Sequence, residues 1–363
     1  MAIRDILIVG AGPSGLATAI AAKQQGLDYV IVEKGMLVNS IFNFPTHMVF
    51  FTTPELLEIG GLPLVTPYDK PTRLEALRYY RRVVDTYGLQ ISFHEQVVAI
   101  EREGDVFAVT TTSPPSSTTP PHVEADLQVR LHGDERRGVR RVRHARAVVL
   151  AIGYYDHPNY LGIPGEDLPH VSHYYTEPHP YYRQRVVIVG GRNSAAETAL
   201  ELFRAGAHVT LVHRQAALGE SIKYWVRPDI ENRIKAGSIA TRFNTRVVEI
   251  TRDSVVVEST SEPVAGGLQA SGRPSGREEI LAEHVLLLTG YKPDVELMRR
   301  AGIRCDEQTL VPDLNPETFE TNVPSLFIAG GAVAGRNTGS IFIENGRFHG
   351  QQILADIAAK LRG

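Results

Sequence analysis

Two stretches of this chain repeat one pattern of apolar residues and glycines. Residues 5–34 and 185–214 align without a gap, and each runs from an unbroken aliphatic segment through a glycine turn and a helix-forming segment to a second aliphatic segment. Unbroken aliphatic runs are typical of parallel strands that are buried on both faces. Each copy therefore predicts a strand–helix–strand unit, with helices over residues 16–25 and 196–205, each followed by a glycine that ends it.

Further elements surround the repeat. Thr72 and Glu75 form a capping box that predicts a helix ending at Gly88. The apolar stripe that should pack this helix on the core consists of Leu74, Leu77, Tyr80 and Val84. Residues 284–290 and 323–331 predict two more buried strands, and the chain should end in one helix from about Ile343 to Leu361.

Alternating segments between residues 105 and 149 predict a β-meander that ends in a buried strand at 147–152. A loose surface loop around Ser113–Ser117 interrupts it, and we expect the arginines of residues 136–146 to be solvated. Residues 263–276 predict a second loose hairpin tip.

The predicted fold class is α/β, with two Rossmann-like βαβ domains built on parallel sheets. Residues 1–160 and 291–363 should form a split FAD-binding domain, and residues 161–290 an NADPH-binding domain inserted between its halves. The length of 363 residues suits two domains.

Composition excludes several classes of protein. Acidic and basic residues are mixed and sum to a net charge of -3, which favours neither a nucleic acid nor a membrane partner. The apolar N-terminus resembles a secretion signal, but Gly10, Gly12, Pro13 and Gly15 interrupt it. No stretch reaches the ~18 apolar residues that span a bilayer, so we expect a cytoplasmic protein. A lone Cys305 excludes a Cys-x-x-Cys pair and cysteine-based metal sites, and we expect no metal.

The first glycine turn has the spacing that binds a dinucleotide. Gly10 permits the tight turn, Gly12 allows a pyrophosphate to approach, and Gly15 allows the helix to pack closely on its strand. Glu33, at the end of the next strand, can accept hydrogen bonds from the hydroxyls of an unphosphorylated ribose, which suits FAD or NAD. The residues expected to bind FAD here are Gly10, Gly12, Pro13, Ser14, Gly15, Glu33 and Lys34.

The second turn departs from this spacing because Arg192 stands where the second glycine is expected. His213 and Arg214 occupy the place of Glu33, and cations near that ribose favour the 2′-phosphate of NADPH. The alternative is that these are merely solvated basic residues, which applies more strongly to Lys223 and Arg227 than to Arg214. The residues expected to bind NADPH are Gly190, Gly191, Arg192, Asn193, Ser194, Ala195, His213, Arg214 and Lys223.

Other segments should pass the inner end of the first nucleotide. His47 lies in an apolar loop and is a candidate proton donor because its ordinary pKa is near neutrality, although a packed loop histidine is an equal alternative. Ser14 is a second candidate catalytic position, where we expect it to bond a phosphate or the flavin edge. The further expected flavin contacts are Thr46, His47, Gly153, Gly330, Gly331, Phe342 and Ile343.

Several long stretches carry a specific likeness. They are residues 45–51, 163–174, 179–181, 190–195 and 341–350. With these stretches the chain resembles the bacillithiol-disulfide reductase family, a branch of the thioredoxin-reductase-like flavoproteins. The resemblance implies FAD on the first fold, NADPH on the second, a homo-oligomer, and reduction of a low-molecular-weight thiol disulfide without a Cys-x-x-Cys pair.

Two departures from the family pattern matter. Members of that family typically carry a cysteine in the first glycine turn, where this chain has Ser14, and a hydroxyl does not exchange with a disulfide. The segment Ala329-Gly330-Gly331 also lacks the acidic residue that follows Ala-Gly in thioredoxin reductases, which leaves one ribityl contact of the flavin unassigned.

Other functions are compatible with these residues. The missing redox cysteine favours electron transfer to ferredoxin or flavodoxin, which some relatives of thioredoxin reductase perform. A non-catalytic nucleotide sensor, whose flavin NADPH does not reduce, is a further alternative.

Overall fold

The computed structural model describes residues 3–114, 138–260 and 276–362. Nearly all of the hairpin tip expected at residues 263–276 lies outside the described residues, as does the end of the loop expected at 113–117.

The chain forms two compact units. One contains Met1–His157 together with Tyr291–Gly363, and the other is Pro158–Gly290. The second unit is therefore an insertion in the sequence of the first. Each unit has its own largely parallel sheet covered by helices, which is the Rossmann-like α/β architecture.

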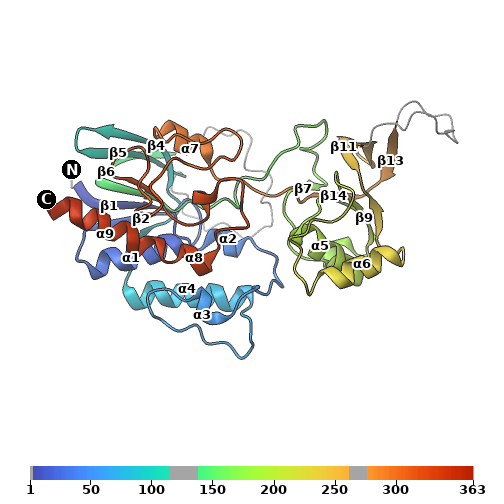
Figure 1. Ribbon diagram of the computed structural model, residues 1–363, viewed down its shortest axis with the longest axis horizontal. Coiled ribbons are helices and arrows are strands. Elements are labelled where there is room, and N and C mark those ends of the chain that lie inside the picture. The colour runs from blue at the N-terminus through green and yellow to red at the C-terminus, as the bar shows by residue number, and fades with distance from the viewer. Residues whose placement is uncertain (1–2, 115–137, 261–275, 363) are drawn as a thin grey trace. The chain divides into compact units, whose positions relative to one another are not determined.

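A seven-stranded sheet forms the centre of the first unit (Figure 1). Its strands are β1 (Ile3–Val9), β2 (Tyr29–Val32), β3 (Ile91–Ser92), β4 (Gln96–Glu103), β5 (Val106–Ser113), β6 (Val139–Leu150) and β15 (Leu326–Ile328). They run in the order β3-β2-β1-β6-β5-β4, and β15 also pairs with β6. β1 pairs in parallel with β2 and β6, whereas β4, β5 and the first part of β6 form the antiparallel meander.

Helices cover both faces of this sheet. They are α1 (Pro13–Gln24), α2 (Asn39–Phe42), α3 (Pro54–Leu57), α4 (Arg73–Tyr87), α7 (Val295–Arg300), α8 (Ile343–Gly346) and α9 (His349–Arg362), with a 3-10 turn η3 at Gly330–Ala334. Figure 1 shows α1 and α9 on one face and α7 on the other. Ile6 and Ile8 of β1 pack in the core on the first face, and Leu7 and Val9 in the core on the second. The aliphatic run of β1 is thus buried on both sides, as its sequence predicts.

The second unit repeats this arrangement on a smaller scale. Its parallel sheet has the order β10-β9-β8-β14-β7, and a separate antiparallel sheet has the order β11-β12-β13. The strands are β7 (Val171–Ser172), β8 (Arg185–Val189), β9 (His208–Val212), β10 (Ala240–Arg242), β11 (Thr245–Ile250), β12 (Ser254–Ser259), β13 (Arg277–Leu281) and β14 (His284–Leu287). The helical elements are η2 (His179–Tyr181), α5 (Asn193–Arg204) and α6 (Arg227–Lys235).

The stripe predicted for α4 is wrong in part. Thr72 and Glu75 do form the capping box, and Gly88 ends the helix at a φ of 53°. However, the buried side chains are Ala76, Tyr79, Tyr80 and Val83, while Leu74 is 49 % exposed. A helical face that begins at Ala76 recurs at three and four residues, which leaves Leu74 on another side.

The C-terminal helix is broken into α8 and α9. The turn at Arg347 and Phe348 allows the Arg347 guanidinium to donate to the carbonyl oxygens of Glu55 (2.6 Å) and Glu58 (2.7 Å). Because these acceptors lie far away in the sequence, helical periodicity gave no sign of the break.

One arginine of the basic stretch is not solvated as expected. Arg143 forms an ion pair of 2.7 Å with Glu95, whose side chain is 1 % exposed. The Ser92 hydroxyl also donates to Glu95, as does that of Thr111. Burial disfavours the charge of Glu95, but these hydrogen bonds lower the pKa of its carboxyl to about 2. Arg143 is therefore a structural residue of the sheet.

Candidate functional site

The three glycines of the first turn, between β1 and α1, are needed for different reasons. A Cβ atom at Gly10 (φ 104°) would lie 2.5 Å from the Ala151 carbonyl oxygen, and one at Gly15 would lie 2.0 Å from the Gly10 carbonyl oxygen. These two glycines are required by the protein's own packing. At Gly12, by contrast, φ is -77° and a Cβ atom would meet nothing within 4 Å. Open space above an unstrained glycine fits the close approach of a dinucleotide phosphate.

Glu33 lies directly beside this turn. Its side chain accepts hydrogen bonds from the backbone N–H of Ala11 (2.7 Å) and of Gly35 (2.8 Å), and the residue is 5 % exposed. Burial raises the pKa of the carboxyl, and the two N–H donors oppose that effect. Each oxygen retains a second acceptor site, so the carboxylate can still receive ribose hydroxyls. Its neighbour Lys34 forms an ion pair of 2.9 Å with Asp156.

Ser14 contacts the C-terminal part of the first unit. A Cβ atom at Gly330 would be 2.6 Å from the Ser14 hydroxyl oxygen, and one at Gly346 would be 3.2 Å from it. The structure thus brings three predicted flavin-site elements together, namely the first glycine turn, the turn after β15 and α8. Gly346 did not feature among the expected contacts.

His349 fixes the turn after β15 and was also missed. Its Nδ1 accepts a hydrogen bond of 3.2 Å from the Gly330 N–H, and its ring stacks on Phe319 at a centroid distance of 4.0 Å. Burial lowers the pKa of His349 to about 4, so the imidazole is neutral near pH 7. A neutral ring is what the acceptor role requires.

The start of α8 is capped by a side chain. The backbone N–H of Phe342 donates to Asn345 Oδ1 at 2.8 Å, and the amide group of Asn345 donates to the Ser340 carbonyl oxygen at 2.9 Å. Asn345 therefore caps this helix, and Phe342 is left 44 % exposed beside it. Gly153, which follows β6, has a φ of 61°.

The loop after α2 carries the other predicted residues, Thr46 and His47, and both side chains are exposed. Arg73 fixes the start of this loop, because its Nε atom donates to the carbonyl oxygens of Ile41 and Phe42, both at 3.1 Å. His47 therefore lies on a surface turn beside an anchored backbone.

The second glycine turn, between β8 and α5, has a different construction. A Cβ atom at Gly190 would lie 2.6 Å from the Leu288 carbonyl oxygen, and one at Gly191 would lie 2.4 Å from atoms of the His213 ring. The imidazole of His213 therefore covers Gly191. Arg192 has an extended backbone (φ -114°, ψ -167°), so an arginine stands there without strain.

Cationic side chains gather at this turn. Burial lowers the pKa of His213, and the charges of Arg214 and Arg192 lower it further. Both arginines are thus close enough to the His213 imidazole to disfavour its protonation, and an anion bound beside them would offset that effect. This arrangement fits the phosphate groups of NADPH.

Asn193 joins the turn to the loop that follows β9. Its side-chain amide donates to the Ser221 carbonyl oxygen at 3.0 Å, and its Oδ1 accepts from the Lys223 backbone N–H at 2.9 Å. The Gly219 N–H also donates to the Gly191 carbonyl oxygen at 2.8 Å. Asn193 thereby positions Lys223 at the turn, while Ser194 stays exposed and Ala195 is buried.

Glu197, on α5, is a further titratable group near this turn that sequence reasoning missed. Burial raises the pKa of its carboxyl to about 7; Lys223 opposes the rise and Glu201 adds to it. The sequence of α5 predicts a helix but does not indicate that the Glu197 side chain is half-buried.

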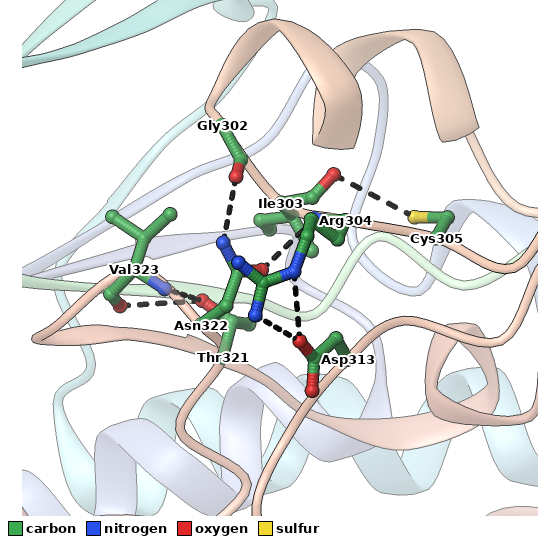
Figure 2. A network of polar contacts seen from close by, with 8 residues as sticks. All are labelled: Gly302, Ile303, Arg304, Cys305, Asp313, Thr321, Asn322 and Val323. Atoms are coloured by element: carbon green, nitrogen blue, oxygen red, sulfur yellow. Dashed lines mark hydrogen bonds and ion pairs between the residues drawn. The ribbon is translucent and has the colours of Figure 1, made fainter.

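Cys305 lies in a structural network instead (Figure 2). Its Sγ atom faces the Ile303 carbonyl oxygen at 4.0 Å, and the neighbouring Arg304 donates to Asp313 through Nε at 3.0 Å. Asn322 donates to the Gly302 carbonyl oxygen at 2.9 Å. Burial raises the pKa of the thiol, which disfavours the reactive thiolate.

The described residues contain neither a grouped metal-binding site nor a membrane-spanning helix. In residues 3–114, 138–260 and 276–362, no three or more His, Cys, Asp and Glu side chains are grouped so as to hold a metal ion. Within the same ranges, no helix is both long and apolar enough to cross a membrane.

Several known proteins are similar to this chain in sequence and fold. The pattern of the pyridine nucleotide-disulphide oxidoreductase family matches residues 7–119 and 139–330. Bacilliredoxin reductase Bdr of Bacillus subtilis is 40 % identical over 357 residues, which cover 98 % of this chain and 97 % of that protein. The structure of bacillithiol disulfide reductase Bdr (YpdA) from Bacillus cereus has a TM-score of 0.86 at 37 % identity, covering 99 % of this chain and all of the other. Thioredoxin reductase of Lactococcus lactis shares the fold, with a TM-score of 0.70 at 19 % identity and 98 % coverage of both chains.

Proposed function

The chain belongs to the pyridine nucleotide-disulphide oxidoreductase family, and from that premise we propose that it is an FAD-dependent enzyme that uses NADPH to reduce bacillithiol disulfide or a related low-molecular-weight disulfide. The reaction balances as NADPH + H⁺ + RSSR → NADP⁺ + 2 RSH. The observation that carries the proposal is the pair of unlike turns, one ending in the anion Glu33 and the other in the cation Arg214.

In this proposal the first unit binds FAD. Gly12 leaves room for the pyrophosphate. The N-terminus of α1 faces it with the backbone N–H groups of Ser14 and Gly15, since Pro13, the first residue of the helix, has none. Glu33 accepts the adenosine ribose hydroxyls. The remaining proposed contacts are Gly10, Gly15, Lys34, Thr46, His47, Gly153, Gly330, Gly331, Phe342 and Ile343.

The second unit binds NADPH in this proposal. The N-terminus of α5 faces the pyrophosphate, while Arg192 and Arg214 neutralise phosphate charge. His213 covers Gly191 and adds a third nitrogen donor when protonated. The other proposed contacts are Gly190, Gly191, Asn193, Ser194, Ala195 and Lys223.

Bound FAD supplies a two-electron carrier between nicotinamide and disulfide. Among the chain's own groups, the exposed imidazole of His47 is our candidate for supplying a proton to a leaving thiolate. Ser14 cannot form a mixed disulfide. We propose that it positions the first turn against Gly330 and Gly346.

Anaerobic mixing tests the proposal directly. NADPH should bleach the flavin absorbance of the purified protein, and bacillithiol disulfide should restore it with two thiols formed per NADPH consumed. A purified protein that is colourless and takes up no FAD would contradict the proposal, whereas a flavin that NADPH does not reduce would indicate the sensor alternative.

One observation favours a second class of electron acceptor. Position 14 carries a serine hydroxyl, whereas disulfide exchange would need a thiol. That class is a small electron-carrier protein such as ferredoxin or flavodoxin. Reoxidation of the flavin by such a carrier, with rates that fall steeply as salt is added, would favour it over the disulfide.

We also propose that the enzyme is a cytoplasmic homo-oligomer. The family resemblance supports the oligomer. A chain with a single cysteine has no intrachain disulfide, which suits a reducing compartment. Sedimentation of the purified protein measures its mass in solution.

A further inference from the structure

Three parallel strands of the first unit end together. β1 pairs with β6 through Val9 and Leu150, and β15 pairs with β6 through Ile328 and Leu150. Parallel strands in register deliver the residues that follow them to one edge of the sheet. The segments after β6 and β15 therefore meet at the edge where the first glycine turn lies.

A tyrosine after β6 covers a glycine after β15 at this edge. A Cβ atom at Gly331 would lie 2.6 Å from Cε1 and 2.8 Å from Cδ1 of the Tyr154 ring. Gly331 is not among the residues with positive φ, so its backbone does not require glycine. What excludes a side chain at position 331 is the ring of Tyr154.

The Tyr154 ring is anchored through its hydroxyl, and the side chain of the next residue is anchored as well. The Tyr154 hydroxyl donates to the Thr338 carbonyl oxygen at 3.3 Å, and the neighbouring Tyr155 donates from its own hydroxyl to the Asn43 carbonyl oxygen at 3.1 Å. Tyr154 is half-buried, with part of its surface open. Moving an anchored ring to make room for a larger residue at position 331 costs free energy.

Position 331 is the one where thioredoxin reductases carry an acidic side chain after Ala-Gly. We infer that the ring of Tyr154 occupies the space that the acidic side chain fills in thioredoxin reductases. Tyr154 is then a flavin-binding residue, with an aromatic ring in place of the carboxylate. The inference deepens the proposed function and rests on it, since it presumes FAD on the first unit. It assigns to Tyr154 the ribityl-side contact that the sequence left without a partner.

The two positions should be coupled in FAD binding. Gly331→Asp alone places a carboxylate against the ring, and the clash should raise the FAD dissociation constant by about tenfold or more. Tyr154→Ala alone removes the contact and should also weaken FAD binding. The double variant, with both changes, regains space for the carboxylate and should bind FAD more tightly than Gly331→Asp.

The experiment is a titration of the four flavin-free proteins with FAD, followed by flavin fluorescence and by absorbance of the bound flavin. Gly339→Asp is a matched control, because a Cβ atom there would meet only Asn337 Oδ1, at 3.8 Å. Tyr154→Phe keeps the ring and should bind FAD as the wild type does. Melting of each flavin-free protein checks that the fold is intact.

The outcomes separate the inference from the proposed function. A wild-type protein that binds no FAD overturns both. A wild-type protein that binds FAD, together with a Gly331→Asp variant of equal affinity or a double variant no better than Gly331→Asp, overturns the role of Tyr154 alone. If Gly331→Asp fails to fold, the comparison of Tyr154→Ala with Tyr154→Phe decides, and equal FAD affinity in these two overturns the inference.

Discussion

The hydroxyl oxygen of Ser14 lies so close to Gly330 that a Cβ atom at position 330 would be only 2.6 Å from it. Ser14 is the second residue of α1, so its side chain lies at the positive end of a 12-residue helix. A thiol at this position would have a lowered pKa and would be a good nucleophile toward a disulfide. The hydroxyl of serine has no such reactivity.

Replacement of Ser14 by cysteine should therefore add chemistry that the wild type lacks. We expect Ser14→Cys to raise NADPH oxidation driven by bacillithiol disulfide by about tenfold or more, because a thiolate exchanges with a disulfide. Steady-state NADPH oxidation measures the effect. Ser14→Ala is the control: it also lacks a thiol and should show no such rise, and a rise of equal size in this variant would mean that the thiol is not its cause.

Gly12 and Gly15 should fail in different ways when each is replaced by alanine. A Cβ at position 12 meets no protein atom, so Gly12→Ala should fold normally and bind FAD at least about tenfold more weakly. A Cβ at position 15 lies 2.0 Å from a carbonyl oxygen, so Gly15→Ala should lose about 1–3 kcal/mol of unfolding free energy. Urea unfolding of the flavin-free proteins and FAD titration distinguish the two. Equal FAD affinity of Gly12→Ala and wild type would exclude a phosphate above that glycine.

Features set by neighbouring residues were predictable from the sequence. Both glycine turns follow a strand and open a helix, and the capping box of Thr72 and Glu75 involves residues only three apart. The aliphatic runs predict buried parallel strands because burial on both faces leaves no polar positions.

Contacts between distant segments were not predictable in this way. The Tyr154 ring meets Gly331 only because β6 and β15 pair, and no periodicity in either segment encodes that pairing. The break between α8 and α9 depends on carbonyl oxygens near α3. The enclosure of Glu197 likewise becomes visible only in the folded second unit.

Arg214 should determine the preference for NADPH. Its guanidinium lies close enough to His213 to lower the pKa of that imidazole, and a 2′-phosphate is the group it would neutralise. We expect Arg214→Ala to raise the KM for NADPH by about tenfold with little change in kcat, since uniform binding is lost. The KM for NADH should not change. Arg252→Ala, at an exposed position of the same unit, is the control, and an equal rise for both coenzymes would refute the assignment.

Glu197 should make the second unit less stable as the pH rises. Burial raises the pKa of its carboxyl from the ordinary 4.5 to about 7, so the folded protein holds this proton more tightly than the unfolded chain does. Stability from this group is therefore fully present below about pH 4.5 and is lost as the pH rises through about 7. Glutamine keeps the shape of the side chain without the charge.

Glu197→Gln should accordingly melt at a higher temperature than the wild type above pH 7.5, by about 2–4 °C, and the difference should vanish toward pH 5. Thermal unfolding of both proteins between pH 5 and pH 8.5 measures it, with Glu220→Gln, an exposed glutamate of the loop after β9, as the control. The positive charge of Lys223 reduces the cost of the half-buried carboxylate, so Lys223→Met in the wild-type background should enlarge the loss of stability at high pH. A difference between Glu197→Gln and wild type that stays constant across this range would mean that the carboxyl does not titrate there, and the enclosure of Glu197 would then have only a packing effect.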